Sequence, residues 1–187
     1  QMPPRHLHLR PQGIQGAHHR IVLKPGHRHA APGLYQTANG NITVNTGLTT
    51  AAGGTLSLSS HQLLGAFTPT NNGTIETQNT SATPIPNGKT WAGTVRYNSL
   101  SGSQIARTGT YNSLVFDNTS GTQTADGAIT TASLTTTTGG IFNMSIFALS
   151  GLSSVTNDGT LRTQNTSVIP FTAGFTWGGT VIFDGIG

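Results

Sequence analysis

Short runs of alternating apolar and polar residues follow one another along residues 37–187. The period of two matches a β-strand, in which successive side chains point to opposite faces of a sheet. The alternating groups are Leu56 and Leu58, Val95 and Tyr97, Leu114 and Phe116, Phe142, Met144 and Ile146, and Val181 and Phe183. Helical spacing is not sustained anywhere, because glycine and proline interrupt every window long enough for a helix. The pattern therefore predicts an all-β protein.

A glycine opens each of nine strand-like runs, and the intervals between these glycines are long and unequal. The glycines are Gly40, Gly54, Gly73, Gly93, Gly109, Gly127, Gly140, Gly159 and Gly179. Single strands repeated at such intervals are typical of a parallel β-solenoid (β-helix), in which each coil of the chain stacks on the preceding coil. The alternative is an antiparallel β-sandwich, whose strands recur about every 8–12 residues. The longer spacing favours the solenoid.

The body of the chain contains an internal repeat. Residues 72–81 return as residues 158–167 at an offset of 86 residues, and apolar positions are matched over a longer stretch. The two copies cover about 40–126 and 127–187, the second being truncated. We expect both copies to wind in the same sense, with matching side chains aligned in columns along a rod.

Charge divides the chain into two regions. Residues 1–36 form a basic arm rich in histidine and proline, with five cations and no acid, whereas residues 37–187 carry four cations and five acids. Charged residues make up only 7% of the chain, against roughly 25% in ordinary soluble domains. Stacked coils explain this scarcity, because a column of like charges repels while columns of Thr and Asn can form hydrogen bonds. The composition argues against a typical cytosolic enzyme.

Three segments carry a resemblance to a known class of repeat. Residues 93–98 (GTVRYN), 109–116 (GTYNSLVF) and 127–130 (GAIT) follow one another at short intervals. This order resembles the β-helical repeats of bacterial secreted cell-surface adhesin-like proteins of the Bacteroidetes type. The resemblance implies an exported, parallel β-helical protein with an adhesive or structural role and no catalytic residues to carry over. The basic arm of residues 1–36 is not part of that pattern.

Catalytic chemistry has little support in the sequence. Asp117 and Asp126 are the nearest pair of acids, and a glycosidase needs two carboxylates about 5–10 Å apart. Both residues are also explained as turn residues, because they stand in the dipeptides Asp-Asn and Asp-Gly. Cysteine is absent, which excludes disulfides and Cys-ligated zinc. We therefore predict that the protein is not an enzyme and holds no cofactor.

Trp91 and Trp177 occupy equivalent positions in the two copies. An exposed aromatic ring on a solenoid face can stack on a sugar ring, so surface glycans are candidate partners. A tryptophan in phase with the apolar residues of a strand more often fills the core. We favour the core interpretation for both residues.

Six of the seven histidines lie in the basic arm, in closely spaced pairs. The pairs are His6 and His8, His18 and His19, and His27 and His29. Histidine pairs can bind metal ions, but neighbouring arginines would repel a divalent cation, so we predict no metal site. The cations have no aromatic residues among them to stack on bases, and no apolar run approaches the roughly 20 residues of a membrane span. We predict neither nucleic-acid binding nor membrane insertion.

Threonine-rich solenoids also suggest ice binding, which requires a flat and regular array of threonines. The threonines Thr43, Thr74, Thr77, Thr130 and Thr135 to Thr138 are numerous but irregularly phased. This irregularity argues against such an array.

The function predicted from these observations is that of a non-enzymatic structural module of an extracellular fibre or cell-surface adhesin. The last residues match Gly93 to Ser99 of the first copy and stop in mid-repeat, so we expect self-assembly into a homo-oligomer or polymer through the solenoid ends and the arm. The predicted assembly contacts are Ile21, Val22 and Leu23 in the arm and Val181 and Phe183 in the body. The alternative is a carbohydrate-binding or polysaccharide-degrading β-helix protein.

Overall fold

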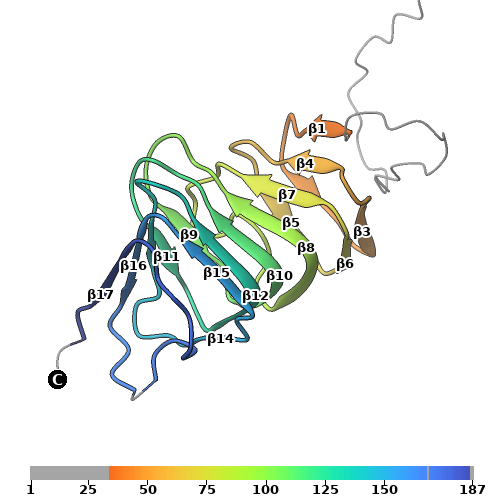
Figure 1. Ribbon diagram of the computed structural model, residues 1–187. Helices are drawn as coiled ribbons and strands as arrows, with labels where there is room; N and C mark the ends of the chain where they lie inside the picture. The colour runs from red at the N-terminus through yellow and green to blue at the C-terminus, as the bar shows by residue number, and fades with distance from the viewer. Residues whose placement is uncertain (1–33, 168, 186–187) are drawn as a thin grey trace, which may run out of the picture.

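The computed structural model describes residues 34–167 and 169–185, and these residues form a parallel β-solenoid without helices (Figure 1). All the strand pairs of the ladders are parallel, which confirms the predicted solenoid and excludes the antiparallel sandwich. The strands are β1 (Tyr35–Thr37), β2 (Ile42–Thr43), β3 (Gly47–Thr50), β4 (Thr55–Ser57), β5 (Leu63–Leu64), β6 (Thr68–Asn71), β7 (Thr74–Thr77), β8 (Lys89–Tyr97), β9 (Gln104–Ala106), β10 (Gly109–Phe116), β11 (Gln123–Ala125), β12 (Ile129–Thr136), β13 (Ile141–Asn143), β14 (Leu149–Ser150), β15 (Ser154–Asn157), β16 (Thr160–Thr163) and β17 (Thr180–Phe183).

The length of one coil is nearly constant along the solenoid. It is the step in sequence from a residue to its ladder partner on the next coil, as from Gly109 of β10 to Ile129 of β12. The longest ladder follows the order β1-β4-β7-β8-β10-β12-β14, so seven successive coils are hydrogen-bonded side by side. A second ladder has the order β9-β11-β13-β16-β17. Successive coils are therefore in register along the rod.

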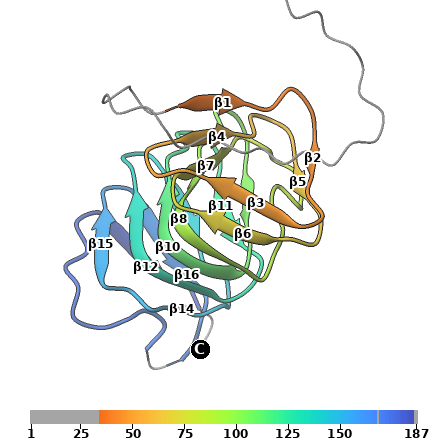
Figure 2. The same cartoon turned by 90° about the vertical axis from the view of Figure 1, so that its right-hand side faces the viewer.

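Each coil presents three faces. Face 1 contains β3, β6, the first halves of β8, β10 and β12, and then β14; Figure 2 shows β3 and β6 side by side. Face 2 contains β1, β4, β7, the second halves of β8, β10 and β12, and then β15. Face 3 contains β2 and β5 at one end of the rod and β9, β11, β13, β16 and β17 further along it.

The two sequence copies keep the same local pairing but lie on different faces. Thr74 pairs with Thr94 on face 2, and the equivalent residues Thr160 and Thr180 pair on face 3. The reason is the length of the copy, because the offset between the copies exceeds four coil lengths by about a third of a coil. Both copies wind in the same sense, as expected, but the expectation that their matching side chains share columns is wrong. Columns join successive coils, and the second copy is turned by one face.

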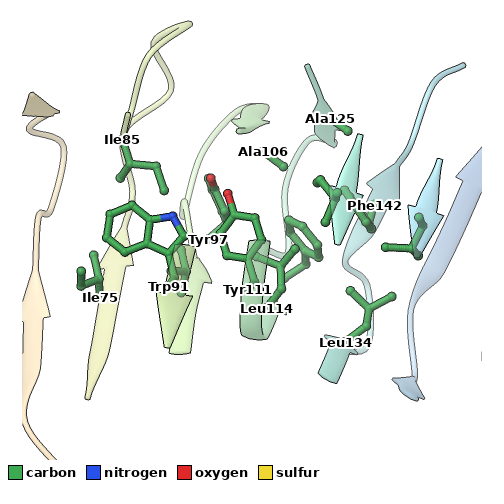
Figure 3. Packing of buried hydrophobic residues seen from close by; sticks show 14 of the residues in the cluster. Ile75, Ile85, Trp91, Tyr97, Ala106, Tyr111, Leu114, Ala125, Leu134 and Phe142 are labelled. Atoms are coloured by element: carbon green, nitrogen blue, oxygen red, sulfur yellow. The ribbon is translucent and has the colours of Figure 1, made fainter. Parts of the chain in front are cut away.

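Aliphatic and aromatic side chains fill the interior of the coils (Figure 3). On face 2 one inward column consists of Leu56, Ile75, Val95, Leu114 and Leu134, all buried. Beside it the ring of Phe116 stacks on the ring of Tyr97, with 5.6 Å between centroids, and on the ring of Phe142, with 3.9 Å. Burying such side chains contributes about 1.5–3 kcal/mol each relative to exposure, so this column supplies much of the stability of the rod.

Some of the predicted inward positions are exposed. Ile146 follows β13 in a turn and is 65% exposed, and Phe183 of β17 is also 65% exposed. The alternation of residues in the sequence predicts which side of a strand is apolar, but burial also needs a neighbouring coil to cover that side.

Glycine is required where successive coils approach most closely. A Cβ atom on Gly73 would lie 2.3 Å from the carbonyl oxygen of Gly54, and one on Gly93 would lie 2.2 Å from that of Gly73. The second copy repeats this column, since a Cβ on Gly179 would lie 2.3 Å from the oxygen of Gly159. Gly73, Gly93 and Gly179, each of which opens a predicted strand, therefore allow the backbones of successive coils to stack at a corner of the coil.

A buried polar ladder lies beside each glycine column. Thr50 Oγ1 donates to Asn71 Oδ1, and Asn71 Nδ2 donates to the carbonyl oxygen of Thr94 over 3.2 Å. The second copy has the same bonds from Thr136 to Asn157 and from Asn157 to the carbonyl oxygen of Thr180. Each ladder links three coils and satisfies polar groups that would otherwise be costly to bury.

Candidate functional site

In the described part of the chain the two ends of the rod are strand edges (Figure 1), and both carry exposed apolar side chains. At one end lies β1, where the side chains of Leu34 and Tyr35 are 54% and 59% exposed. At the other end lies β17, which pairs with β16 on one side and, among the described residues, with no strand on the other. A strand edge with unpaired N–H and C=O groups can bind a further strand. The two ends are therefore candidate assembly surfaces.

The predicted assembly residues fall in two places. Val181 pairs with Leu161 and is half-buried against the core, whereas the Phe183 ring is 65% exposed and its centroid lies 5.7 Å from that of the Phe171 ring. The other three predicted contacts (Ile21, Val22 and Leu23) lie outside the described residues. The exposed Phe183 ring is thus the large apolar side chain that β17 offers to a partner.

A column of charged residues crosses face 2. Arg96 Nη1 lies 3.9 Å from Glu76 Oε2, and Arg96 Nη2 donates to Asp117 Oδ2 on the following coil. Glu76 also accepts a hydrogen bond from the Tyr35 hydroxyl over 2.5 Å, and this bond raises the pKa of Tyr35. The side chains of Arg96 and Asp117 are 41% and 24% exposed. The column therefore contributes modest stability while fixing the register of its coils.

Asp117 and Asp126, the acids considered as a catalytic pair, bind different arginines. Asp117 is held by Arg96, and Asp126 forms an ion pair with Arg107 and accepts a hydrogen bond from the N–H of Thr108 over 2.6 Å. The structure therefore gives both carboxylates a role in linking coils.

The two tryptophans differ in burial. Trp91 is fully buried and its ring meets the Phe67 ring edge-on, with 6.4 Å between centroids, which confirms the core interpretation. Trp177 is half-buried and packs between Phe171 and Phe175, with centroid distances of 5.6 Å and 6.3 Å. The core interpretation holds only in part for Trp177, because this residue precedes β17 at the end of the rod.

Two tyrosines share a buried polar contact inside the coil (Figure 3). The Tyr97 hydroxyl accepts a hydrogen bond from the N–H of Arg107 over 3.0 Å, and the Tyr111 hydroxyl donates to the carbonyl oxygen of Arg107 over 2.5 Å. Burial raises the pKa of Tyr97 to about 12 and holds the pKa of Tyr111 well above its ordinary value. Both hydroxyls are thus protonated at neutral pH and serve the packing of the core.

Face 1 carries a column of exposed hydroxyl side chains. Thr49 pairs with Thr70 between β3 and β6, and further along the rod Thr90, Thr110 and Thr130 form a column in register on three successive coils. Ser150 extends the column, and its Oγ lies 3.2 Å from Oγ1 of Thr130. All six residues are exposed. The column thus presents one hydroxyl per coil at a spacing of about 4.8 Å.

Sequence reasoning missed this column. Of the threonines considered irregularly phased in the sequence only Thr130 belongs to it, and its other members, Thr90, Thr110 and Ser150, were not considered. The unequal intervals between the glycine-led runs concealed the constant coil length. A search for hydroxyl residues at the period of one coil would have found the column.

One open pocket lies at the β17 end of the rod. Its volume is about 400 Å³, and it is lined by Ile146, Gln164, Asn165, Thr166 and Asp184. Asp184 Oδ2 accepts a hydrogen bond from Arg162 Nη2 over 2.5 Å, so the acid in the pocket is already paired. In residues 34–167 and 169–185, His, Asp and Glu form no group of three that could hold a metal ion.

Comparison with known proteins finds no matching family model, no similar curated protein and no similar solved structure. Within the described part of the chain no helix is long and apolar enough to cross a membrane.

Proposed function

We propose that this chain is a non-enzymatic structural module of an extracellular fibre or cell-surface adhesin. The observation that carries the proposal is the parallel solenoid, in which seven coils stack in one continuous ladder and the described part of the rod has an exposed aromatic ring at each end, Tyr35 in β1 and Phe183 in β17. The resemblance of residues 93–130 to adhesin-like repeats agrees with this role and with a location outside the cell. In such a module the rod itself performs the structural role, because it spans a distance and resists bending.

The contacts between coils support a stiff rod. The glycine columns, the buried ladders of Thr50 and Thr136, and the charged column of Arg96 all join neighbouring coils. Because each coil contacts only its neighbours, stiffness depends on the sum of these interfaces. Most of the ionic groups are used in this way, which leaves the surface of the body nearly uncharged.

The module assembles end to end in this proposal. The coil that ends in β17 of one copy stacks on the first coil of the next copy in the parallel arrangement that every internal coil uses, and this contact covers Phe183 of one copy and Tyr35 of the other. Such β-strand addition takes its affinity from main-chain hydrogen bonds and its specificity from side chains. Ile21, Val22 and Leu23 of the arm are expected to reinforce this contact. The partner is thus a second copy of the same chain.

Electron microscopy of the purified protein tests the proposal. We expect filaments or long particles for the parent chain, and their loss in Phe183→Asp, because a carboxylate at the contact would be desolvated. Leu100→Asp is the matched control, since Leu100 is 77% exposed in a turn along the rod. Monomers of the parent chain at every concentration, or equal effects of the two substitutions, would contradict end-to-end assembly. Deletion of residues 1–33, which leaves β1 (Tyr35–Thr37) in place, should shorten the filaments, and unchanged length would remove the arm from the proposal.

Ice binding is a second candidate function, favoured by the exposed column from Thr90 to Ser150 on face 1. A column of hydroxyls at about 4.8 Å provides a regular one-dimensional array of the kind that an ordered water lattice can match. Thermal hysteresis and ice-crystal shaping measure this activity. We expect Thr110→Lys to abolish the activity and Thr156→Lys, on face 2, to preserve it; absence of activity in the parent chain excludes this function.

Carbohydrate binding or cleavage is the alternative predicted from the sequence. The half-buried ring of Trp177 is the one of the two tryptophans that a sugar could reach. Binding on a glycan array that is lost in Trp177→Ala would favour this alternative. Release of reducing ends from a polysaccharide, lost in Asp117→Asn, would favour a hydrolase.

A further inference from the structure

Three Asn-Gly dipeptides occur in the body, and the structure holds them in different ways. They are Asn39-Gly40, Asn72-Gly73 and Asn87-Gly88, and all three asparagines are exposed. Asparagine followed by glycine is the sequence at which spontaneous deamidation is chemically easiest, because glycine has no side chain to hinder the reacting amide and its backbone rotates freely. Whether the reaction occurs depends on how freely that amide can move.

Asn72-Gly73 is held firmly on both sides. The N–H of Asn72 donates to the carbonyl oxygen of Thr50 over 3.0 Å, and the N–H of Thr74 donates to that of Gly54 over 2.8 Å. The amide of Gly73 lies between them, is buried in the glycine column and donates to Thr50 Oγ1 over 3.3 Å. Its nitrogen cannot approach the side chain of Asn72 unless the corner of the coil opens.

Asn87-Gly88 is held by one bond. The N–H of Gly88 donates to the carbonyl oxygen of Thr108 over 2.8 Å, and Gly88 adopts a positive φ of 66°. Both residues are exposed. This turn can therefore open at the cost of a single solvent-accessible hydrogen bond.

Asn39-Gly40 is the least constrained of the three. The dipeptide lies in the turn between β1 and β2, and no described residue accepts a hydrogen bond from the N–H of Gly40. A Cβ atom on Gly40 would have no atom within 4 Å, so the surrounding space is open. The flanking amides of Ala38 and Ile42 are hydrogen-bonded to the next coil, so the freedom is confined to the turn.

We propose that Asn39 is a site of spontaneous deamidation and that the fold protects Asn72. The backbone nitrogen of Gly40 attacks Cγ of Asn39, a C–N bond forms, and the side-chain nitrogen leaves as ammonia after receiving the proton of the Gly40 amide. Water then opens the five-membered succinimide at either carbonyl group, which yields aspartate or isoaspartate. The net change adds water and releases ammonia, with no oxidant or reductant.

The modification changes the coil that carries β1. Either product adds a negative charge to a nearly uncharged surface, and isoaspartate also lengthens the backbone of the β1–β2 turn by one carbon atom. This inference does not depend on the proposed function, because the reaction requires only the folded chain and water.

Peptide mapping of the full chain, incubated at mildly alkaline pH, tests the proposal. In the native protein we expect Asn39 to deamidate at least about tenfold faster than Asn72, because the corner of the coil that holds Asn72 must first open. The deamidation rate of Asn87 should lie between these two rates. In concentrated guanidinium the three rates should become similar, since each site is then an Asn-Gly dipeptide in an unfolded chain. This denatured sample is the internal control for the effect of neighbouring residues.

The outcomes are distinct. A native rate at Asn72 within about twofold of that at Asn39 would overturn the protection, and a native rate at Asn39 more than about tenfold below its denatured rate would overturn the reactive site. Gly40→Ala should slow the reaction at Asn39 and leave the rate at Asn87 unchanged, because the added methyl group hinders only the amide that follows Asn39. An unchanged rate at Asn39 in this variant would contradict attack by the residue 40 amide.

Discussion

The two copies of the repeat share their backbone pairing and differ in what covers them. In the first copy β8 is flanked by β7 and β10, so Trp91 and Tyr97 are fully buried. In the second copy the equivalent Trp177 is half-buried and Phe183 is 65% exposed, because β17 is an edge strand of the described residues. The same sequence pattern therefore builds a core position or a surface position, depending on whether a further coil lies beside it. Substitutions at equivalent sites can test this conclusion.

The largest difference in the loss of stability is expected between the substitutions Trp91→Ala and Trp177→Ala. Removing the fully buried indole of Trp91 should lower the free energy of unfolding by about 3–5 kcal/mol, since it leaves a cavity that the coils cannot close. Trp177→Ala should cost about half as much, because its ring is partly solvated already. Urea unfolding followed by circular dichroism measures both values. Equal losses of stability would show that Trp91 and Trp177 are equally buried in solution.

The glycine columns should instead behave alike in the two copies. Gly93→Ala and Gly179→Ala each place a methyl group within about 2.3 Å of a carbonyl oxygen of the preceding coil, and each should cost about 2–3 kcal/mol. Gly40→Ala is the control, because the space around Gly40 is open, and it should change the stability by less than about 0.5 kcal/mol. Thermal unfolding of the three variants compares them. A tolerated Gly93→Ala would contradict the close approach of the coils.

The stability at alkaline pH should depend on the buried tyrosines of the first copy. Burial raises the pKa of Tyr97 to about 12, so the unfolded chain, whose tyrosines ionise near pH 10, loses its proton first as the pH rises. The stability that the buried Tyr97 contributes is complete below about pH 10 and falls by about 1.4 kcal/mol per pH unit between about pH 10 and 12.

Tyr97→Phe should reduce this slope, measured as the pH dependence of urea unfolding. Phe183→Tyr, at the equivalent position of the second copy, should leave the slope unchanged, because an exposed tyrosine ionises similarly in the folded and unfolded chain. A steeper slope in Phe183→Tyr would indicate that β17 is covered in solution.

The smallest losses of stability are expected when the ion pairs are removed. Asp117→Asn and Asp184→Asn remove the partners of Arg96 and Arg162, whose side chains are 41% and 40% exposed. Each substitution should cost less than about 1 kcal/mol, and less still in high salt, because solvent screens exposed charges. Chemical denaturation at two salt concentrations measures the effect. A loss of several kcal/mol from Asp117→Asn would mean that the charged column on face 2 is a principal support of the rod.

The fold class was predictable from the sequence because period-two alternation and the glycine-led runs are local signals. All nine predicted runs contain a strand, and Gly73 and Gly93 stand where the coils approach most closely. Short polar strands such as β9 and β11 were missed, since their sequences QIA and QTA show little alternation and are extended only because neighbouring coils pair with them.

The candidate surfaces were harder to predict than the fold. The column from Thr90 to Ser150 depends on the constant coil length, which becomes visible only when corners and strands are placed in space. Exposure of Phe183 likewise depends on its neighbours and not on its own strand, so the alternation that includes it indicated burial. The ion pairs of Asp117 and Asp126 join residues about one coil apart, a relation that their nearness in sequence conceals.

The third of a coil by which each copy exceeds four full turns has a consequence for any longer array of such units. A side chain that occurs once per unit would point in a new direction with every unit and would return to its first direction after three. Substituents spaced in this way would wind around the shaft as a shallow spiral instead of lining one side of it. A shaft decorated like this can engage neighbours from any direction, and no rotation about its long axis would be needed to bring a contact into reach.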